Sequence, residues 1–286
     1  METVLVTGAT GQLGKVVVEA LVEKKLSVRA AARNAGRIAT TQLVEPVEFE
    51  YENYATYDRV LDRSLGVFLV APPLDPDAPA KLIPFIDAAR KADVVYIVFC
   101  SVLGADANEQ SPLRVIERYL TGSDIGYTII RPNFFMENFS TGFLAPMIAG
   151  GEIALAAGDG RTSFVSIRDV AAAVAALFVE ACCGTEYNLT GPEALSYSQV
   201  AKMISDVSKR KIAYRDISDE EMILTARGWG FPENAARCLA ELYGAVRSDS
   251  LSVVTKDMQE LIGRNPISFS DFAGKNASRW RLAKAA

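Results

Sequence analysis

The chain contains no histidine among its 286 residues. This absence excludes Ser-His-Asp and Cys-His catalytic arrangements, together with metal sites that depend on imidazole ligands. The four cysteines include no Cys-x-x-Cys pair, so the sequence also lacks the usual ligands of a structural zinc. We therefore expect no metal site.

The sequence is equally poor in basic blocks and in long apolar runs. Its formal net charge is −5, whereas a nucleic-acid surface normally carries a basic stripe. The longest apolar stretch, residues 170–179, is too short to span a bilayer, and we find no signal-peptide pattern. These features predict a cytoplasmic protein that binds neither nucleic acid nor a membrane. They leave open whether it forms a homodimer.

The most informative segment that the chain does have is a glycine-rich turn near its amino terminus. Gly8, Gly11 and Gly14 follow the apolar run 4–6 and open a segment with helical periodicity. A helix that begins after such a turn presents unpaired backbone N–H groups at its positive end, where a pyrophosphate binds. The glycines allow the tight turn, the approach of the phosphates and close packing of helix on strand. The turn predicts a dinucleotide site; the alternative is a tight turn without a ligand.

The predicted second strand, residues 26–32, ends at Arg33. A site for NAD would place Asp or Glu about 20 residues past the glycines, where it binds the ribose 2′-hydroxyl. No acidic residue occurs from Lys24 through Leu43, and Arg33 stands in that place instead. A guanidinium suits a 2′-phosphate, because it forms charge-assisted and bidentate hydrogen bonds. We therefore expect NADP(H) rather than NAD(H), the alternative being a solvated loop arginine.

Predicted strands and helices alternate through the first half of the chain. Near-continuous apolar runs such as residues 66–71 and 94–99 are typical of a parallel sheet that is covered on both faces. The expected fold class is α/β, a Rossmann-like doubly wound parallel sheet with a smaller, mainly helical C-terminal substrate lobe. The expected parts are an NADP(H)-binding core over residues 1–188, to whose cleft part of 140–162 contributes, a lobe over 189–275 and a polar tail over 276–286.

Ligands of such sheets bind at the carboxyl ends of the strands, and we place the candidate site there. Ser101 is the candidate catalytic residue, with an orienting role, unless it only caps the end of its strand. The predicted cofactor-binding residues are Gly8, Thr10, Gly11, Gln12, Leu13, Arg33, Asn53, Ala71, Pro72, Cys100, Ser101, Pro132 and Phe134. The predicted substrate-binding residues are Arg114, Phe135, Phe139 and Trp229.

Five segments together resemble the NmrA-like branch of the atypical short-chain dehydrogenase/reductases. They are residues 6–14, 31–34, 130–138, 164–171 and 187–196. The chain is also similar to the clavine alkaloid dehydrogenases, the triphenylmethane reductases and the NADPH-quinone reductases of that branch. The resemblance implies a Rossmann core that binds NADP(H) and a substrate cleft between core and lobe. The branch also contains proteins that bind dinucleotide and regulate transcription without known chemistry.

Ordinary short-chain dehydrogenases pass a proton to a carbonyl oxygen with a Tyr-x-x-x-Lys pair. None of the ten tyrosines here is followed by a lysine four residues later. A carbonyl reductase or an epimerase without its proton relay would lose about 10²–10⁴-fold in rate. Hydride transfer to an iminium ion or a triarylmethyl cation needs no acid, because it neutralises the substrate, and a reduced quinone can take its proton from water.

These observations favour an NADPH-dependent reductase of a planar conjugated or cationic organic substrate. An imine or iminium ion is the first choice, and a quinone or a dye is the next. The alternative is a catalytically silent, NADP(H)-sensing regulatory protein of the NmrA type, which would bind dinucleotide without turnover. An isomerase or epimerase with a bound cofactor is a third interpretation, which the missing Tyr-Lys pair weakens.

Overall fold

The computed structural model describes residues 3–180 and 183–281, and the contacts divide the chain into two compact units. The first unit comprises Met1–Pro132, Ile167–Leu189 and Asp257–Gly263. The second comprises Asn133–Ser166, Thr190–Lys256 and Arg264–Ala286. The division is therefore more interleaved than the single boundary near residue 188 that the sequence predicts, because the chain passes between the units several times.

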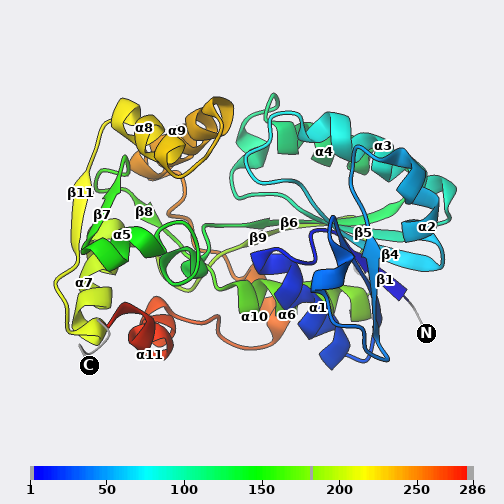
Figure 1. The fold of residues 1–286 in the computed structure, drawn as a ribbon, viewed down its shortest axis with the longest axis horizontal. Helices are drawn as coiled ribbons and strands as arrows, with labels where there is room; N and C mark the ends of the chain where they lie inside the picture. The colour runs from blue at the N-terminus through cyan, green and yellow to red at the C-terminus, as the bar shows by residue number, and fades with distance from the viewer. Residues whose placement is uncertain (1–2, 181–182, 282–286) are drawn as a thin grey trace. The chain divides into compact units, whose positions relative to one another are not determined.

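The first unit is built on a parallel sheet, which has seven strands in the part of the chain that is described (Figure 1). The strand order is β3-β2-β1-β4-β5-β6-β9, and every pair of neighbours is parallel. The strands are β1 Thr3–Val6, β2 Ser27–Ala32, β3 Val44–Glu48, β4 Ser64–Val70, β5 Tyr96–Cys100, β6 Gly126–Pro132 and β9 Thr185–Leu189. The order reverses between β1 and β4, which is where such sheets bind their ligands. The predicted Rossmann-like fold class is confirmed.

Helices cover both faces of this sheet (Figure 1). On one face lie α1 Gln12–Glu23, α6 Ile167–Glu180 and α10 Asp257–Ile262. On the other lie α2 Tyr57–Leu61, α3 Ala78–Lys91 and α4 Pro112–Thr121. Because both faces are covered, the strands carry apolar residues at successive positions rather than at alternate ones.

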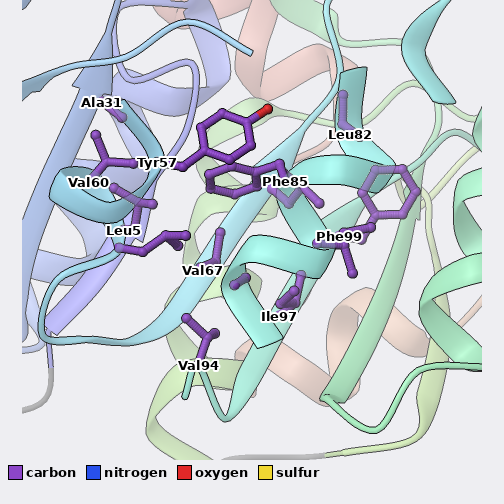
Figure 2. Packing of buried hydrophobic residues seen from close by; sticks show 14 of the residues in the cluster. Leu5, Ala31, Tyr57, Val60, Val67, Leu82, Phe85, Val94, Ile97 and Phe99 are labelled. Atoms are coloured by element: carbon purple, nitrogen blue, oxygen red, sulfur yellow. The ribbon is translucent and has the colours of Figure 1, made fainter. Parts of the chain in front are cut away.

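A large apolar core fills the space beneath α2, α3 and α4 (Figure 2). Leu5, Val67 and Ile97 contribute to it from three neighbouring strands. Phe85 of α3 packs against them, and the centroids of the Phe85 and Tyr57 rings are 5.1 Å apart. Alternate strand residues such as Phe68 point to the opposite face and are buried there. This double-sided burial makes the sheet a rigid platform for the loops at its carboxyl edge.

The second unit is mainly helical and contains two small sheets. Strand β7 Glu152–Leu155 pairs in parallel with β11 Ala213–Asp216, and β8 Arg161–Thr162 pairs antiparallel with β10 Leu195–Ser196. The helices are α5 Ala145–Gly150, α7 Tyr197–Ser208, α8 Asp219–Gly228, α9 Glu233–Arg247 and α11 Phe269–Trp280. No helix of the described residues is long and apolar enough to cross a membrane.

The first residues of the segment predicted as a polar tail, 276–280, belong to helix α11. Helix α11 continues to Trp280, whose side chain is buried. The Trp280 indole N–H donates a hydrogen bond of 2.8 Å to the carbonyl of Phe139. The burial and hydrogen bond of Trp280 near the end of the helix, together with the Ser268 cap at its start, order a segment whose composition is largely polar.

Candidate functional site

The glycine-rich turn links β1 to α1 and has little room for side chains. Gly8 has a φ of +62°, in the left-handed region that favours glycine. A Cβ on Gly14 would lie 2.2 Å from the carbonyl oxygen of Gly8, so helix and turn approach too closely for any other residue. Gly11 is the N-cap of α1 and provides no side-chain cap. The turn therefore brings backbone close to backbone, and the N-cap of this twelve-residue helix contributes no side-chain hydrogen bond.

Thr7, which sequence reasoning did not single out, fixes the start of this turn. It is fully buried, and its hydroxyl donates to the carbonyl of Phe68 at 3.1 Å and accepts from the N–H of Val70 at 3.0 Å. The hydroxyl of Tyr51 donates to the carbonyl of Val70 at 2.8 Å. The two Thr7 bonds join the carboxyl ends of β1 and β4, at the point where the strand order reverses, and the Tyr51 bond joins the segment after β3 to the end of β4. A polar residue at the end of an apolar strand was the only sequence signal for this role.

Replacing Thr7 with valine should lower the free energy of unfolding by ~1–3 kcal/mol, because valine has the same shape but leaves the Val70 N–H without its acceptor. Denaturant unfolding of the two proteins measures this difference. A loss below about 0.5 kcal/mol would contradict the role we give to Thr7.

The residues of this turn that were predicted to bind the cofactor differ in how exposed their side chains are. Thr10, Gly11 and Gln12 are exposed, whereas the side chain of Leu13 is buried in the first unit. Leu13 can therefore contact a ligand only through its backbone N–H. The exposed residues offer polar backbone and side-chain groups at the positive end of the helix.

Arg33 follows β2 at the same edge of the sheet. Its side chain is exposed, and it has no ion pair or side-chain hydrogen bond with any residue in the described part of the chain. Arg29, four residues earlier, is buried, and its guanidinium makes a bidentate ion pair with Glu45, at 3.0 and 3.1 Å. The two arginines of this segment thus have different roles: Arg29 ties β2 to β3, and Arg33 is available to a ligand.

The other predicted cofactor-binding residues of the first unit also lie at or beside the carboxyl ends of strands. Asn53 is exposed in the segment after β3, and Ala71 and Pro72 are half-buried directly after β4. Cys100 is buried at the end of β5, and burial raises the pKa of its thiol to about 12, so it stays protonated at neutral pH. The carbonyl of Pro132, the last residue of β6, accepts a hydrogen bond of 3.0 Å from the Leu103 N–H.

Ser101 directly follows β5 and is 2 % exposed. Its backbone N–H donates to the carbonyl of Ile130 at 2.9 Å, which continues the pairing of β5 with β6. Its hydroxyl has no hydrogen-bond partner of good geometry among the described residues. Backbone bonding therefore fixes the position of Ser101, while its side chain keeps its hydrogen-bonding capacity.

A buried ion-pair cluster lies beside Ser101. Glu117 of α4 is completely buried, and Arg131 donates to both of its carboxylate oxygens at 2.8 Å. Arg114 adds a third bond to Glu117 at 3.0 Å, and Glu186 of β9 accepts from Arg131 at 2.6 Å. Burial raises the pKa of Glu117, but the hydrogen bonds from Arg131 and Arg114 hold it below its ordinary value, so the carboxyl stays ionised.

This cluster bears on one of the predicted substrate-binding residues. Glu117 and its partner Arg131, which comes from the neighbouring strand, are buried together. Arg114 was predicted to bind substrate. Its guanidinium instead donates hydrogen bonds to Glu117 and Glu109, so few of its N–H groups remain for a ligand.

The predicted aromatic residues lie in the second unit. Phe139 is 0 % exposed and packs edge-on against Phe164 at 5.2 Å between centroids, so it belongs to the core and offers no surface to a substrate. Phe134 is half-buried and stacks on Tyr243 at 5.5 Å. Phe135 and Trp229 are also partly exposed. The Trp229 ring lies 5.5 Å from that of Phe143.

The residues of the first unit fit a dinucleotide that carries a 2′-phosphate. The glycine turn leaves no space for a Cβ at Gly14 and no side-chain cap on α1, as a site for a pyrophosphate requires. The cation at the end of β2 has no partner in the described residues, and the buried Ser101 hydroxyl at the end of β5 has none either. The adenosine half of a dinucleotide would lie at the end of β2, near Arg33, and the nicotinamide half at the end of β5, near Ser101.

Curated relatives align with nearly the whole chain. A Dictyostelium discoideum protein, prestalk A differentiation protein A, is 31% identical over 96% of this chain and 93% of its own length. Agroclavine dehydrogenase of Claviceps fusiformis is 30% identical over 98% of this chain and 99% of its own.

Two solved structures share the fold. The NADPH-dependent quinone oxidoreductase of Escherichia coli, complexed with NADPH, has a TM-score of 0.84 and 26% identity over 95% of this chain and 99% of its own. The triphenylmethane reductase of Citrobacter sp., complexed with NADP(H), has a TM-score of 0.83 and 26% identity over 96% and 99%. The model of the NmrA-like family matches residues 1–272, and the chain belongs to that family.

Proposed function

We propose that this chain is an NADPH-dependent oxidoreductase that delivers hydride to a planar conjugated or cationic organic substrate, an imine or iminium ion foremost. One observation carries the proposal: an uncapped helix start at a glycine turn and a partner-free arginine lie on the same edge of a parallel sheet. The first attracts a pyrophosphate and the second a 2′-phosphate. The proposal predicts that NADPH is the preferred cofactor.

The relatives support this assignment. The quinone oxidoreductase and the triphenylmethane reductase were each solved with NADPH or NADP(H), and agroclavine dehydrogenase is named as a dehydrogenase of an alkaloid. The names of these proteins specify a quinone, a triphenylmethane and agroclavine. They differ in the reducible group, so the choice of an iminium ion rests on the chemistry of this chain's own residues.

Within the first unit each candidate residue has a distinct task. The backbone N–H groups of Gln12 and Leu13 bind the pyrophosphate, and Gly8 and Gly14 allow it to approach. Arg33 binds the 2′-phosphate, with Arg37 nearby in sequence. Asn53, Ala71 and Pro72 line the middle of the edge. Ser101 and Pro132 lie where the nicotinamide end is expected.

When bound, NADPH would supply a hydride, which is two electrons and one proton. Its transfer to an iminium carbon would give a neutral amine and NADP⁺, so the reaction would need no proton from the protein. The residues near Ser101 suit such a reaction. Glu117 is ionised and clamped by two arginines, and Cys100 has a strongly raised pKa, so neither is a proton donor poised near neutral pH.

Partly exposed aromatic rings of the second unit are the candidates for substrate binding. Trp229 and Phe143 form a pair, and Phe135 lies in the loop after Asn133. A flat cation over an aromatic face gains about 0.5–2 kcal/mol. Phe139 is not a candidate, because its side chain is completely buried in the core of the second unit.

Tyr119 lies on the helix that carries the Tyr-Lys pair in ordinary short-chain dehydrogenases. Its hydroxyl donates to Asp87 at 2.6 Å, and this bond raises its pKa. We expect Tyr119→Phe to keep turnover within about twofold of the wild type, since removing an acting general acid costs about 10²–10⁴-fold. Steady-state rates at saturating NADPH measure this. A drop of about 100-fold with unchanged NADPH affinity would show that Tyr119 donates a proton after all.

The proposal itself is tested by NADPH oxidation with three substrate classes: a cyclic iminium salt, a quinone and a triarylmethane dye. We expect steady oxidation with at least one of them, fastest with the iminium salt. If the protein binds NADPH but oxidises it with none of the three, the reductase is excluded and the regulatory alternative takes its place.

A further inference from the structure

A groove that the proposed reaction does not use opens between helices α2 and α3 of the first unit, which lie side by side (Figure 1). This α2–α3 groove has a volume of about 460 Å³. Its lining includes the buried side chains of Tyr57 and Leu61 from α2 and the half-buried Ala88 from α3. None of the lining residues is one to which we assign a part in binding cofactor or substrate. The groove has room for an aromatic side chain of a partner.

Exposed apolar side chains border the α2–α3 groove. Tyr54 is one of the lining residues and is 60 % exposed, and its ring meets that of Tyr57 edge-on, with 5.4 Å between the centroids. Leu65 and Val95 are 42 % and 62 % exposed, and the Val95 N–H donates to the Leu65 carbonyl at 3.0 Å. Each of the two follows a lining residue of the groove by two or three positions in the chain. Exposed apolar side chains that gather in this way mark a surface that contacts another protein.

Two exposed charges of opposite sign also line the groove, Asp58 from α2 and Lys91 from α3. Neither has an ion pair or a side-chain hydrogen bond with any residue that the structure describes. The other lining charges are bonded already: Asp62 pairs with Arg63 at 3.4 Å, and Asp87 accepts from a tyrosine hydroxyl at 2.6 Å. The unpaired acid and the unpaired base are therefore the charges with which a partner can pair.

This face of the first unit is complementary to itself. It carries an exposed tyrosine beside a groove, and an unpaired acid together with an unpaired base. A two-fold axis brings the same surface of two copies together, so that each contact between two different residues occurs twice. An acidic partner would leave the acid unpaired and a basic partner would leave the base unpaired, whereas a second copy of this chain pairs both.

We propose that the α2–α3 groove is the interface of a two-fold symmetric homodimer, in which Tyr54 of each protomer enters the groove of the other and Asp58 pairs with the partner's Lys91. Tyrosine is among the residues that contribute most to binding at protein interfaces. The two ion pairs fix the orientation of the copies more than they add affinity. Leu65 and Val95 extend the apolar contact beyond the groove, toward the area that a stable interface needs.

Sedimentation equilibrium of the full chain measures the dissociation constant of the dimer. We expect the wild type to dimerise and Tyr54→Ala to raise this constant at least about 10-fold. Leu224→Ala is the matched control, because it removes another strongly exposed apolar side chain, from helix α8. It should leave the constant within about twofold of the wild-type value. A monomeric wild type, or unchanged dimerisation of Tyr54→Ala, would overturn the proposal.

An exchange of charges tests the contact between Asp58 and Lys91 directly. In the dimer Asp58→Lys sets two bases against each other and Lys91→Glu sets two acids against each other, each of them twice. Either variant alone should therefore dimerise about 10–100-fold more weakly than the wild type. An equal mixture of the two variants restores both contacts between opposite charges. We expect it to form a heterodimer whose dissociation constant is within about threefold of the wild-type value.

The double variant Asp58→Lys with Lys91→Glu should self-associate like the wild type for the same reason. The substituted side chains are exposed, so the variants should fold, and circular dichroism checks this. Two weakened variants that do not recover on mixing would show that Asp58 and Lys91 do not meet across a two-fold axis. A wild-type dimer that none of these substitutions changes would have its interface on another face, and either result would overturn the proposal.

Discussion

Replacing Arg33 with alanine should weaken NADPH binding about 10–100-fold and change NADH binding by less than about twofold. The guanidinium is exposed at the end of β2, has no partner in the described residues, and stands where an acid would bind the ribose hydroxyls of NAD. Of the two nucleotides, only NADPH carries the 2′-phosphate that we propose this cation binds. Calorimetric titration of both nucleotides measures the two affinities, and the loss should shrink at high salt because the site is open to solvent.

Arg279→Ala is the matched control for this experiment, because it removes another exposed arginine from helix α11. It should leave both affinities unchanged. The reverse substitution is also informative: Arg33→Asp should reject NADPH more strongly and favour NADH, because a carboxylate repels the phosphate and accepts from the ribose hydroxyl. Equal losses for the two nucleotides in Arg33→Ala would show that Arg33 does not bind the phosphate.

Gly14→Ala should reduce NADPH binding by about 100-fold or more, with a loss of ~1–3 kcal/mol in stability. The new Cβ would lie 2.2 Å from the Gly8 carbonyl oxygen and 2.8 Å from its carbon, and both are backbone atoms that cannot rotate away. Helix α1 must therefore move away from the turn, and the N–H groups that we propose bind the pyrophosphate move with it. Calorimetry and thermal unfolding measure the two effects.

Gly274→Ala is the control that separates the close contact at Gly14 from the general effect of replacing a helical glycine with alanine. Gly274 lies inside helix α11, where an added Cβ would meet no atom within 4 Å. We expect normal NADPH binding and a gain of about 0.4–1 kcal/mol in stability. Normal nucleotide binding by Gly14→Ala would contradict the close approach on which the site is built.

The helix after the glycine turn and the place of Arg33 at the end of a strand could be predicted from the sequence. The helix predicted near residues 12–23 is α1, and Arg33 directly follows β2. Both depend on residues that are neighbours in the chain, so turn chemistry and hydrophobic periodicity suffice. Strand β3, Val44–Glu48, includes Pro46, which the edge position of this strand accommodates.

The buried ion pairs could not be predicted in this way. Glu117 and Arg131 are fourteen residues apart, and only the packing of α4 beside β6 brings them together. A helical pattern alone cannot tell that a glutamate faces a buried arginine. Likewise, a phenylalanine after a strand is equally consistent with core and with a substrate surface. Tertiary packing decides between them, and it places Phe139 in the core.

The central claim is that NADPH bound at the edge of the parallel sheet gives its hydride to carbon. It is tested most directly with NADPH that carries deuterium at the transferable position, an iminium salt or a triarylmethane dye as acceptor, and mass spectrometry of the product. We predict one deuterium on the reduced carbon for each NADP⁺ formed, and the loss of this transfer in Gly14→Ala. Full NADPH binding by the wild type without any deuterium in either product would contradict the account.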